Sequence, residues 1–344
     1  MKAAQFAEHG DAEVLRLVDI ADPVAGPDEV VVALEAAALN RLDLAIRKGL
    51  PGIKVARPHT LGCEGYGRVA SVGAGVGHVA PGDTVVVTPG MSCLRCEACA
   101  RGEDSLCRSY RMIGYQRPGC YAAQVVVPAG NVFHADDRLT PHEWAALPLV
   151  YLTAWRMLMA RARLAPGETV LVQAAGSGVG IAAIQIAKLM SARVITTVGS
   201  EAKRTKALAL GADHVIDYTR NDVATEVKHL TGGAMVDIVI EHTGAATWEG
   251  SVGSLKWGGR LVTCGATDAT PVSVDLRHLF VKQFDWLGSY MGGRHDLMQV
   301  LKLAGAGRLQ PVVDRVIPLA EAAEAHRYLD SRAAFGKVVL SMNG

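Results

Sequence analysis

Short apolar runs alternate with helical periodicity over residues 169–289 of the chain. Short apolar runs are typical of buried strands, whereas apolar residues spaced three and four positions apart are typical of helices. The predicted helices are Ile181–Lys188, Glu201–Leu210, 223–230 and 247–255. The predicted strands are Thr169–Val172, Arg193–Val198, His214–Asp217, Val236–Glu241, Arg260–Gly265 and Phe284–Ser289. This alternation predicts an α/β domain in which helices cover both faces of a parallel, doubly wound sheet.

A turn rich in small residues joins the first of these strands to the first helix. Such a turn lets backbone N–H groups approach a pyrophosphate at the helix N-terminus, as in a Rossmann domain. The strand before it and the helix after it make a plain structural turn the weaker interpretation. The residues that we expect to bind a dinucleotide here are Ala174, Gly176, Ser177, Gly178, Val179 and Gly180.

Length and composition fit a globular chain of about two domains. The chain has 344 residues, of which 50% are hydrophobic and 20% charged, and its formal net charge is +1. That charge gives no indication of nucleic-acid binding. No apolar run reaches the roughly 18 residues that a membrane span needs, and the N-terminus lacks the apolar core of a signal peptide. We therefore expect a cytoplasmic protein without nucleic-acid or membrane partners.

Four cysteines with close spacing form the second strong motif. Cys93, Cys96, Cys99 and Cys107 follow the pattern C-x2-C-x2-C-x7-C. Four thiolates on one loop can surround Zn²⁺ tetrahedrally, and disulfides are disfavoured in a cytosolic chain. We expect a structural zinc in a lobe at about residues 90–110. Four cysteines leave no open coordination position for chemistry; the alternative is unligated thiols or a redox cluster.

These motifs, in this order, resemble the zinc-containing medium-chain dehydrogenase/reductase superfamily. The segment Leu61–Val69 is similar to the family signature G-H-E-x-x-G-x-V, and 72–76 and 81–85 continue it. The resemblance implies a β-rich, GroES-like catalytic domain (1–149 and 290–344) and a Rossmann domain (150–289). It implies a small-molecule substrate. It also implies a homodimer or homotetramer, in which Asp285–Ser289 pairs with its symmetry mate.

The chain departs from the family at the catalytic zinc. The family's three ligand positions hold Asn40, Cys63 and Leu149 here. Asn is a poor zinc ligand and Leu is none, whereas catalytic zinc sites usually have three protein ligands. We therefore expect no catalytic zinc. The alternative is a remodelled site, built from Cys63 with Glu64, Asp43 or His59.

Without that Lewis acid, hydride transfer needs an acceptor that is already activated. An alkene conjugated to a carbonyl, or a quinone, meets this need, because the developing enolate requires only hydrogen-bond donors. Zinc-free quinone oxidoreductases and enoyl-thioester reductases of the superfamily carry Asn at the Asn40 position. The segment Glu241–Gly244 is similar to crotonyl-CoA reductase/carboxylases, but Gln116 stands where they have Glu. We therefore expect simple reduction without carboxylation.

The resemblance implies roles for three candidate catalytic residues. Asn40 would orient the substrate carbonyl or the nicotinamide ribose. His242, at the end of a strand, would donate a hydrogen bond or proton to the enolate; the alternative is that it packs on the cofactor ribose. Tyr115 is an alternative donor or a wall of the pocket. Asp43 could pair with Lys337 on the predicted last strand, Gly336–Leu340.

The second strand of the Rossmann domain indicates the cofactor. An NAD enzyme has Asp or Glu at the end of this strand, whereas Val198 ends it here and Gly199 and Ser200 follow. We expect NADPH, because this space fits a phosphate and Lys203 and Arg204 supply positive charge. NADH use is the alternative if Glu201 turns inward. The resemblance adds the cofactor contacts Arg41, Thr153, Gly265 and Ala266.

The leading hypothesis is an NADPH-dependent oxidoreductase that reduces an enone, an enoyl thioester or a quinone. Two hypotheses from other classes stay open. One is an alcohol dehydrogenase with the remodelled zinc site, and the other is a protein that binds NADPH without turnover.

Overall fold

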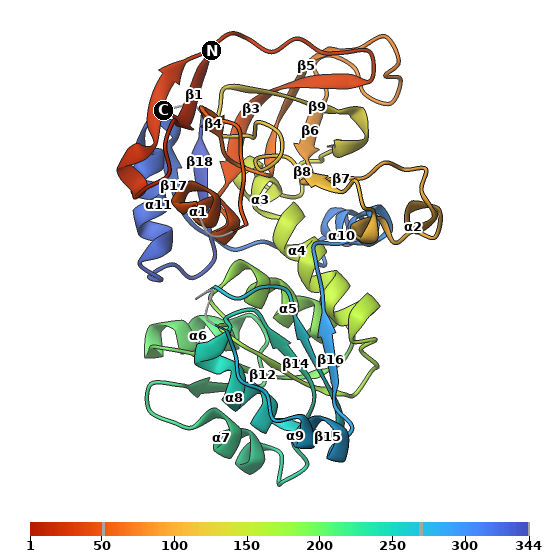
Figure 1. The fold of residues 1–344 in the computed structure, drawn as a ribbon, viewed down its shortest axis with the longest axis vertical. Helices are drawn as coiled ribbons and strands as arrows, with labels where there is room; N and C mark the ends of the chain where they lie inside the picture. The colour runs from red at the N-terminus through yellow and green to blue at the C-terminus, as the bar shows by residue number, and fades with distance from the viewer. Residues whose placement is uncertain (50–51, 268–270, 343–344) are drawn as a thin grey trace. The chain divides into compact units, whose positions relative to one another are not determined.

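The computed structural model describes residues 1–49, 52–267 and 271–342, which form two compact units (Figure 1). The β-rich unit contains residues 1–149 and 293–344, and the α/β unit contains residues 150–292. Both parts of the predicted fold class are present: a β-rich domain and a parallel sheet of the Rossmann type. The second boundary lies three residues after the expected residue 290.

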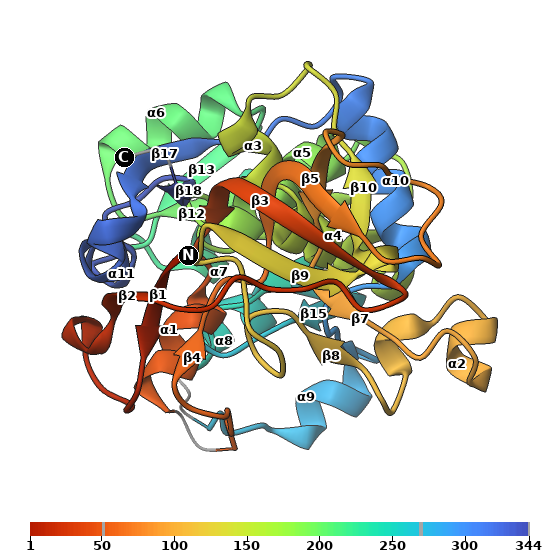
Figure 2. The same cartoon turned by 90° about the horizontal axis from the view of Figure 1, so that it is seen from above.

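Antiparallel pairing dominates the β-rich unit (Figure 2). Its main sheet has the order β10-β6-β5-β3-β18-β17, with β9 also paired to β3, and smaller sheets have the orders β2-β1-β4 and β7-β8. The strands are β1 (Lys2–Phe6), β2 (Arg16–Asp19), β3 (Glu29–Ala38), β4 (His59–Thr60), β5 (Gly65–Val72), β6 (Thr84–Val87), β7 (Gly90–Met91), β8 (Arg111–Met112), β9 (Gln124–Pro128), β10 (Val132–His134), β17 (Val313–Pro318) and β18 (Lys337–Ser341).

Valine alternation explains the core of this unit. Every second residue of β3 reaches the same face, and Val30, Val32 and Leu34 lie in one buried cluster with Val85 and Val87 of β6. The helices of the unit are α1 (Arg41–Lys48), α2 (Glu97–Ala100), α3 (Pro141–Ala146), α10 (Arg294–Gly305) and α11 (Ala322–Asp330), with short 3₁₀ turns at Ala12–Val14, Asp104–Leu106, Ala129–Asn131 and Leu319–Glu321.

The α/β unit confirms the six-stranded parallel sheet, with the order β13-β12-β11-β14-β15-β16. Three elements differ from prediction by two residues or more: β15 begins five residues early, α5 begins three residues early, and α8 is displaced by two residues toward the N-terminus. The strands are β11 (Thr169–Val172), β12 (Arg193–Val198), β13 (His214–Asp217), β14 (Val236–Glu241), β15 (Leu255–Thr263) and β16 (Asp285–Gly288). The helices are α4 (Pro148–Trp155), a π-helical segment Arg156–Arg161, α5 (Gly178–Leu189), α6 (Glu201–Ala209), α7 (Val223–Leu230), α8 (Ala245–Gly253) and α9 (Leu276–Val281).

The parallel strands are apolar on both faces because helices cover both. Leu171, Ile195 and Val239 point to the side that α7 and α8 cover, through Val227 and Val252. The strand β16 forms one edge of the sheet, as predicted, and Trp286 within it is partly buried. Its ring meets Trp248 at 5.4 Å between centroids, edge to face. Among the described residues, no helix is both long and apolar enough to traverse a bilayer.

Candidate functional site

The turn after β11 has the geometry that the sequence predicts. Ser177 caps α5, because its Oγ accepts the Gly180 N–H at 2.8 Å. Ala174 adopts a left-handed conformation (φ 52°), which brings its carbonyl over the first turn. A Cβ on Gly180 would lie 2.4 Å from that carbonyl oxygen, so only glycine fits there.

This turn can hold an anion. In the part of the chain that the structure describes, the N–H groups of Gly176, Gly178 and Val179 donate to no protein acceptor. These three residues are partly exposed at the start of a helix of 12 residues. Free N–H groups at a helix N-terminus suit a phosphate group. The turn therefore fits the pyrophosphate of a dinucleotide.

His242 lies beside this turn, immediately after β14. Its Nε2 is 3.0 Å from the carbonyl oxygen of Gln173 and 3.3 Å from Ser177 Oγ. A carbonyl only accepts, so Nε2 carries the hydrogen and, in the neutral ring, Nδ1 carries the lone pair. Neutral His242 can therefore accept a hydrogen bond at Nδ1, and it can donate there only as an imidazolium. This geometry also fits the alternative role beside the cofactor.

A buried carboxylate that sequence reasoning missed holds the His242 loop in place. Glu241 is fully buried, and its Oε1 accepts the N–H groups of Thr243 (2.7 Å) and Gly244 (3.1 Å). Its Oε2 accepts the Ser251 hydroxyl at 2.5 Å, and Ser251 in turn accepts from Gln173 Nε2. These bonds link the carboxyl ends of β11 and β14. The strand order reverses between these two strands, and nucleotides bind at this point in such sheets.

The end of β12 contains the residues predicted to select the cofactor. Ser200 caps α6 through a long bond of 3.4 Å from the Lys203 N–H. The phenol of Tyr218 lies against Gly199, where an added Cβ would be 2.5 Å from its oxygen. Arg204 donates to the Val215 carbonyl oxygen at 2.7 Å, which directs its guanidinium to β13. The side chain of Glu201 is 83% exposed.

The remaining expected cofactor contacts have different surroundings. Thr153 is buried in α4. The loop that contains Gly265 and Ala266 is tied to the His242 loop, because Thr267 Oγ1 donates to the His242 carbonyl oxygen at 3.0 Å. In the β-rich unit, half-exposed Arg41 lies 3.7 Å from Asp330.

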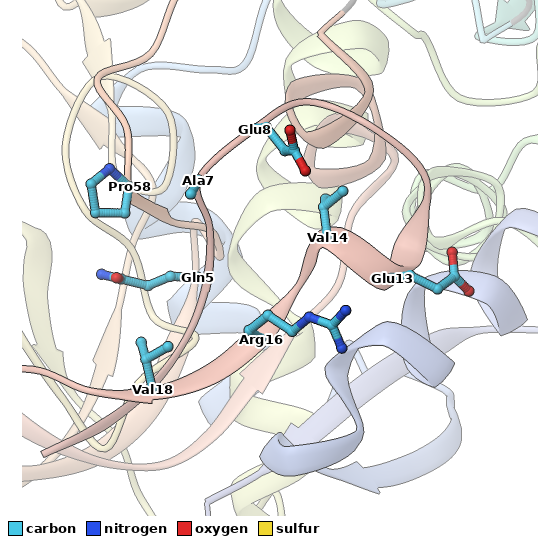
Figure 3. A pocket seen from close by; sticks show the side chains of 8 residues that line it. All are labelled: Gln5, Ala7, Glu8, Glu13, Val14, Arg16, Val18 and Pro58. Carbon is cyan, nitrogen blue, oxygen red and sulfur yellow. The ribbon is translucent and has the colours of Figure 1, made fainter.

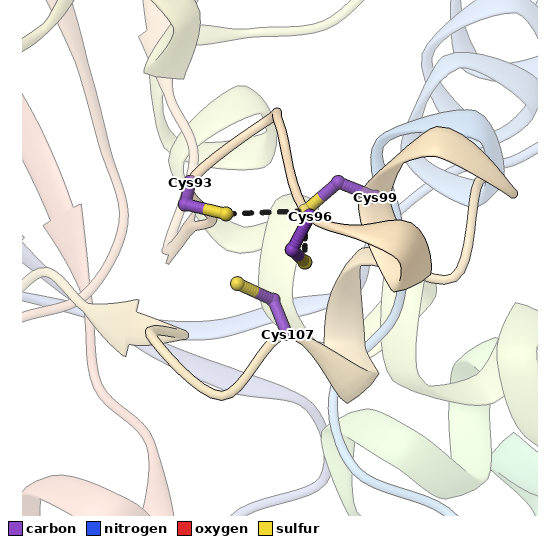
Figure 4. A group of neighbouring side chains, drawn as sticks. All are labelled: Cys93, Cys96, Cys99 and Cys107. Carbon is purple, nitrogen blue, oxygen red and sulfur yellow. Dashed lines mark hydrogen bonds between the residues drawn. The ribbon is translucent and has the colours of Figure 1, made fainter.

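The four predicted zinc ligands come together (Figure 4). The four Sγ atoms all lie within 4.8 Å of one another, with Cys96 and Cys99 at 3.5 Å. Tetrahedral zinc with Zn–S bonds of about 2.3 Å needs sulfurs roughly 3.8 Å apart. The residues therefore fit a structural zinc ion. Next to them, Asp104 accepts the Arg294 N–H at 2.8 Å and so joins the lobe to α10.

Asn40, Glu64 and Lys337 form a buried polar cluster in the β-rich unit. Asn40 follows β3 and occupies the N-cap position of α1, Glu64 precedes β5, and Lys337 begins β18. These segments meet because β3 pairs with both β5 and β18. The exposed fractions are 6% for Asn40, 0% for Glu64 and 5% for Lys337.

Each polar atom of this cluster has a partner. Lys337 Nζ donates to Asn40 Oδ1 at 2.6 Å and to Glu64 Oε1 at 2.8 Å. Asn40 Nδ2 donates to Glu64 Oε1 at 2.8 Å and contacts Cys63 Sγ at 3.5 Å. Glu64 Oε2 accepts the Leu149 N–H at 2.6 Å, at the start of α4. Both Asn40 N–H groups are thus engaged within the protein, and neither is left for a substrate carbonyl.

These contacts do not fit a second zinc ion. Within residues 1–49, 52–267 and 271–342, the only group of three or more metal-ligating side chains is the four-cysteine cluster. His59 Nε2 lies 3.0 Å from the Gly114 carbonyl oxygen and does not join Cys63. Burial beside Asp43 and Glu64 raises the pKa of the Cys63 thiol well above its usual value, which disfavours the thiolate that metals bind.

Asp43 does not make the pair with Lys337 that the sequence suggested; Glu64 does. Asp43 Oδ2 instead accepts the Asn40 N–H at 2.7 Å and the Tyr121 hydroxyl at 3.1 Å, and Oδ1 accepts the Gly62 N–H at 3.2 Å. Gly62 has φ 94°, and a Cβ there would lie 2.4 Å from the Tyr121 ring. Burial raises the pKa of Asp43 to about 6, against the opposing effect of these hydrogen bonds.

We expect Asp43 to make the protein less stable as pH rises. A folded-state pKa of about 6, above the usual 3.8, means that the stabilising contribution is complete below about pH 4 and lost as pH rises through about 6. The loss is on the order of 3 kcal/mol. Urea unfolding between pH 4 and 7 should show this decline in the wild type, and Asp43→Asn should flatten it. Exposed Asp285→Asn is the control; an unchanged decline in Asp43→Asn would contradict the assignment.

Tyr115 packs against the core of the β-rich unit, and Gln116 stabilises a turn. The Tyr115 ring is partly buried against the core of the β-rich unit. Gln116 Oε1 accepts the Met112 N–H at 2.8 Å, while its own N–H donates to the Met112 carbonyl oxygen. Gln116 thus closes the turn after β8. Its side chain therefore stabilises this loop.

A separate hollow lies on the β-rich unit (Figure 3). It contains none of the residues discussed above, and its lining is mixed acidic, apolar and basic. We assign it no role in the chemistry. Its lining residues are Gln5, Ala7, Glu8, Glu13, Val14, Arg16, Val18 and Pro58.

Two family models and several known proteins match this chain. Residues 26–137 match the model of the alcohol dehydrogenase GroES-like domain, and residues 178–306 match that of the zinc-binding dehydrogenases. The chain is 32% identical to an NAD-dependent alcohol dehydrogenase of Sulfurisphaera tokodaii, over 99% of both chains. It is 31% identical to an acryloyl-coenzyme A reductase of Metallosphaera sedula, over 99% of this chain and 100% of the relative. A crystal structure of an NAD-dependent alcohol dehydrogenase superposes with a TM-score of 0.97, at 47% identity over both full lengths.

Proposed function

We propose that this chain, which belongs to the medium-chain dehydrogenase/reductase superfamily, is an NADPH-dependent reductase of activated double bonds that uses no catalytic metal. Its substrates would be enones or enoyl thioesters, with quinones as acceptors of the same kind. The observation that carries this proposal is the Asn40–Glu64–Lys337 cluster, in which an ammonium group takes two of the oxygen donors that a metal ion would need.

The lack of a metal site limits the chemistry. A simple ketone is a weaker hydride acceptor than a conjugated alkene, and a metal ion is one way to activate its oxygen. A conjugated alkene accepts hydride at its β-carbon, the negative charge moves to the carbonyl oxygen, and a proton then adds at the α-carbon. NADPH, when bound, supplies the hydride. The name of the acryloyl-coenzyme A reductase relative fits this class of substrate.

We assign the cofactor to the α/β unit. The N–H groups of Gly178 and Val179 would bind the pyrophosphate, and Ser177 would hold the helix end that presents them. Glu241 holds the loop of His242. His242 lies beside this turn and would contact the cofactor ribose, or protonate the enolate as an imidazolium.

We propose NADPH as the physiological cofactor, and Lys203 as the residue that selects it. Ser200 and Lys203 begin α6, directly after β12, where a 2′-phosphate would lie. Lys203→Ala should raise the KM for NADPH by about 10- to 100-fold, the value of one charge-assisted hydrogen bond, and leave the KM for NADH nearly unchanged. Steady-state kinetics with both cofactors measures this. Arg204→Ala is the contrast, because its guanidinium is bonded to Val215; equal effects on both cofactors in Lys203→Ala would contradict the assignment.

The proposed function is tested by offering the purified protein NADPH with a conjugated enone, an enoyl thioester, a benzoquinone and a saturated ketone. We expect turnover of the first two or of the quinone, none of the ketone, and no inhibition by a metal chelator. The names of the alcohol dehydrogenase relatives favour a second candidate, oxidation of alcohols with NAD. Chelator-sensitive oxidation of an alcohol would overturn our proposal in its favour.

We further propose that two copies associate through β16. This strand is the edge of its sheet and, among the described residues, pairs with no strand other than β15. An open edge otherwise favours aggregation, and continuation of the sheet into a second copy would satisfy it. Sedimentation analysis at several concentrations distinguishes dimer or tetramer from monomer.

A further inference from the structure

The cation of the Asn40–Glu64–Lys337 cluster is the Lys337 ammonium group. Because it is covalently part of the chain, it cannot dissociate as a bound metal ion can. The Lys337 ammonium lies 2.6 Å from an amide oxygen and 2.8 Å from a carboxylate oxygen. Asn40 Nδ2 brings the Cys63 sulfur into the same group of atoms, at 3.5 Å. An amide oxygen, a carboxylate oxygen and a sulfur are together a donor set that binds divalent transition metals. Here, the ammonium already occupies both oxygens.

The Lys337 ammonium balances the negative charge of a buried carboxylate. Glu64 is a fully buried carboxyl group beside Asn40, whereas buried Asp43 accepts hydrogen bonds from Asn40, Tyr121 and Gly62 instead. A buried anion without a counter-charge is costly. In a metalloenzyme a bound ion supplies that counter-charge. In this chain Lys337 supplies it, and the buried pair of Lys337 with Glu64 needs nothing else.

We propose that Lys337 takes the place of a catalytic metal ion. Its ammonium keeps divalent ions away from Cys63 and Glu64, and it holds the Asn40 amide in one orientation. This makes Lys337 a positioning residue, which acts through Asn40 and Glu64. The inference rests on the proposed metal-free function and gives the structural reason why that function needs no metal.

The test is cobalt binding to protein whose four-cysteine site is already filled with zinc. Cobalt is chosen because Co²⁺ bound to a thiolate has a charge-transfer absorption that silent Zn²⁺ lacks. Wild type should bind no cobalt. Lys337→Met loses the ammonium but keeps Glu64 and Cys63, so it should bind about one Co²⁺ per chain with the thiolate absorption. Removing Cys63 as well, in Lys337→Met/Cys63→Ala, should abolish that absorption.

Two controls make the result specific. Lys337→Arg keeps the cation and should exclude cobalt like the wild type, and exposed Lys302→Met should behave identically. If Lys337→Met does not fold in metal-free buffer, we expect added Co²⁺ to restore a cooperative thermal unfolding transition in this variant.

Each result bears on a different claim. Cobalt bound to Cys63 of the wild type would overturn both this inference and the metal-free function. No cobalt in the wild type, with neither binding nor restored folding in Lys337→Met, would overturn the role of Lys337 alone. In that case the proposed reduction of activated double bonds would stand, because the substrate assay tests it separately.

Discussion

Replacing Glu64 by Gln is expected to lower the free energy of unfolding by about 3–5 kcal/mol, the cost of removing one partner from a buried ion pair. The Lys337 ammonium is 5% exposed and would keep no anionic partner within hydrogen-bond distance. The carboxylate also accepts hydrogen bonds from Asn40 and Leu149. A Gln amide can accept at one atom only, so at least one of these donors loses its acceptor. Urea unfolding of zinc-loaded protein at neutral pH measures the change.

Glu201→Gln is the matched control, because the Glu201 side chain is 83% exposed. It should change the free energy of unfolding by less than about 0.5 kcal/mol. If Glu64→Gln also cost under about 1 kcal/mol, the pair with Lys337 would be no stronger than a surface ion pair. The cluster would then be a weak basis for either proposal.

The fold could be predicted from sequence because each element carries its own local signal. Apolar runs gave β12 (Arg193–Val198) and β14 (Val236–Glu241) at their observed bounds. The error at β15 also has a local cause. Gly258 and Gly259 interrupt the apolar pattern, so the sequence predicts a strand that begins at Arg260, whereas Leu255 already pairs with Val236.

The cofactor turn could be predicted for the same reason. Its strand, its glycines and its helix are contiguous in sequence, and the cap from Ser177 to Gly180 spans three residues. The four cysteines span 15 positions and converge as their spacing predicts. Where ligands or donors lie within one loop, spacing constrains geometry directly.

The Asn40 cluster could not be predicted, because 273 residues separate Glu64 from Lys337. The sequence indicates Asn40, Cys63 and Lys337 as candidate residues, but it suggests Asp43 as the partner of Lys337 in an ion pair. Both carboxyl groups are buried beside Asn40, and only the pairing of β3 with β5 and β18 decides which one the ammonium meets. Sequence periodicity contains no information on such a choice.

His242 illustrates a similar limit. Its position after a strand indicated a place among the cofactor-binding loops, and Ser177 and Gln173 are indeed its neighbours. The hydrogen-bond partner of Nε2 determines which nitrogen carries the proton, and that partner is a backbone carbonyl 69 residues away. The chemical role therefore depends on a contact that the sequence cannot specify.

Cys93→Ser is expected to remove zinc almost completely and to unfold the lobe around it. Wild type should contain about one zinc per chain, since the four sulfurs form a closed site, and the loss of one thiolate leaves three. The lobe has little else to hold it: α2 spans only Glu97–Ala100, and its residues are not buried. Metal binding in such small lobes is a large part of their folding free energy. Amide hydrogen exchange across residues 92–108 should therefore accelerate at least about 100-fold.

The pairing of β7 with β8, Gly90 with Met112 and Met91 with Arg111, should confine this unfolding to the lobe, because it closes the segment at both ends. Exchange in β11 and β14 of the α/β unit should stay unchanged, and Cys264→Ala, a cysteine outside the lobe, should keep its zinc. Elemental analysis gives the sharper result. One zinc in the wild type and none in Cys93→Ser agrees with a single structural site. Two zinc ions per chain in the wild type, with one retained in Cys93→Ser, would indicate a metal site beside Cys63. That result would contradict the proposed metal-free chemistry.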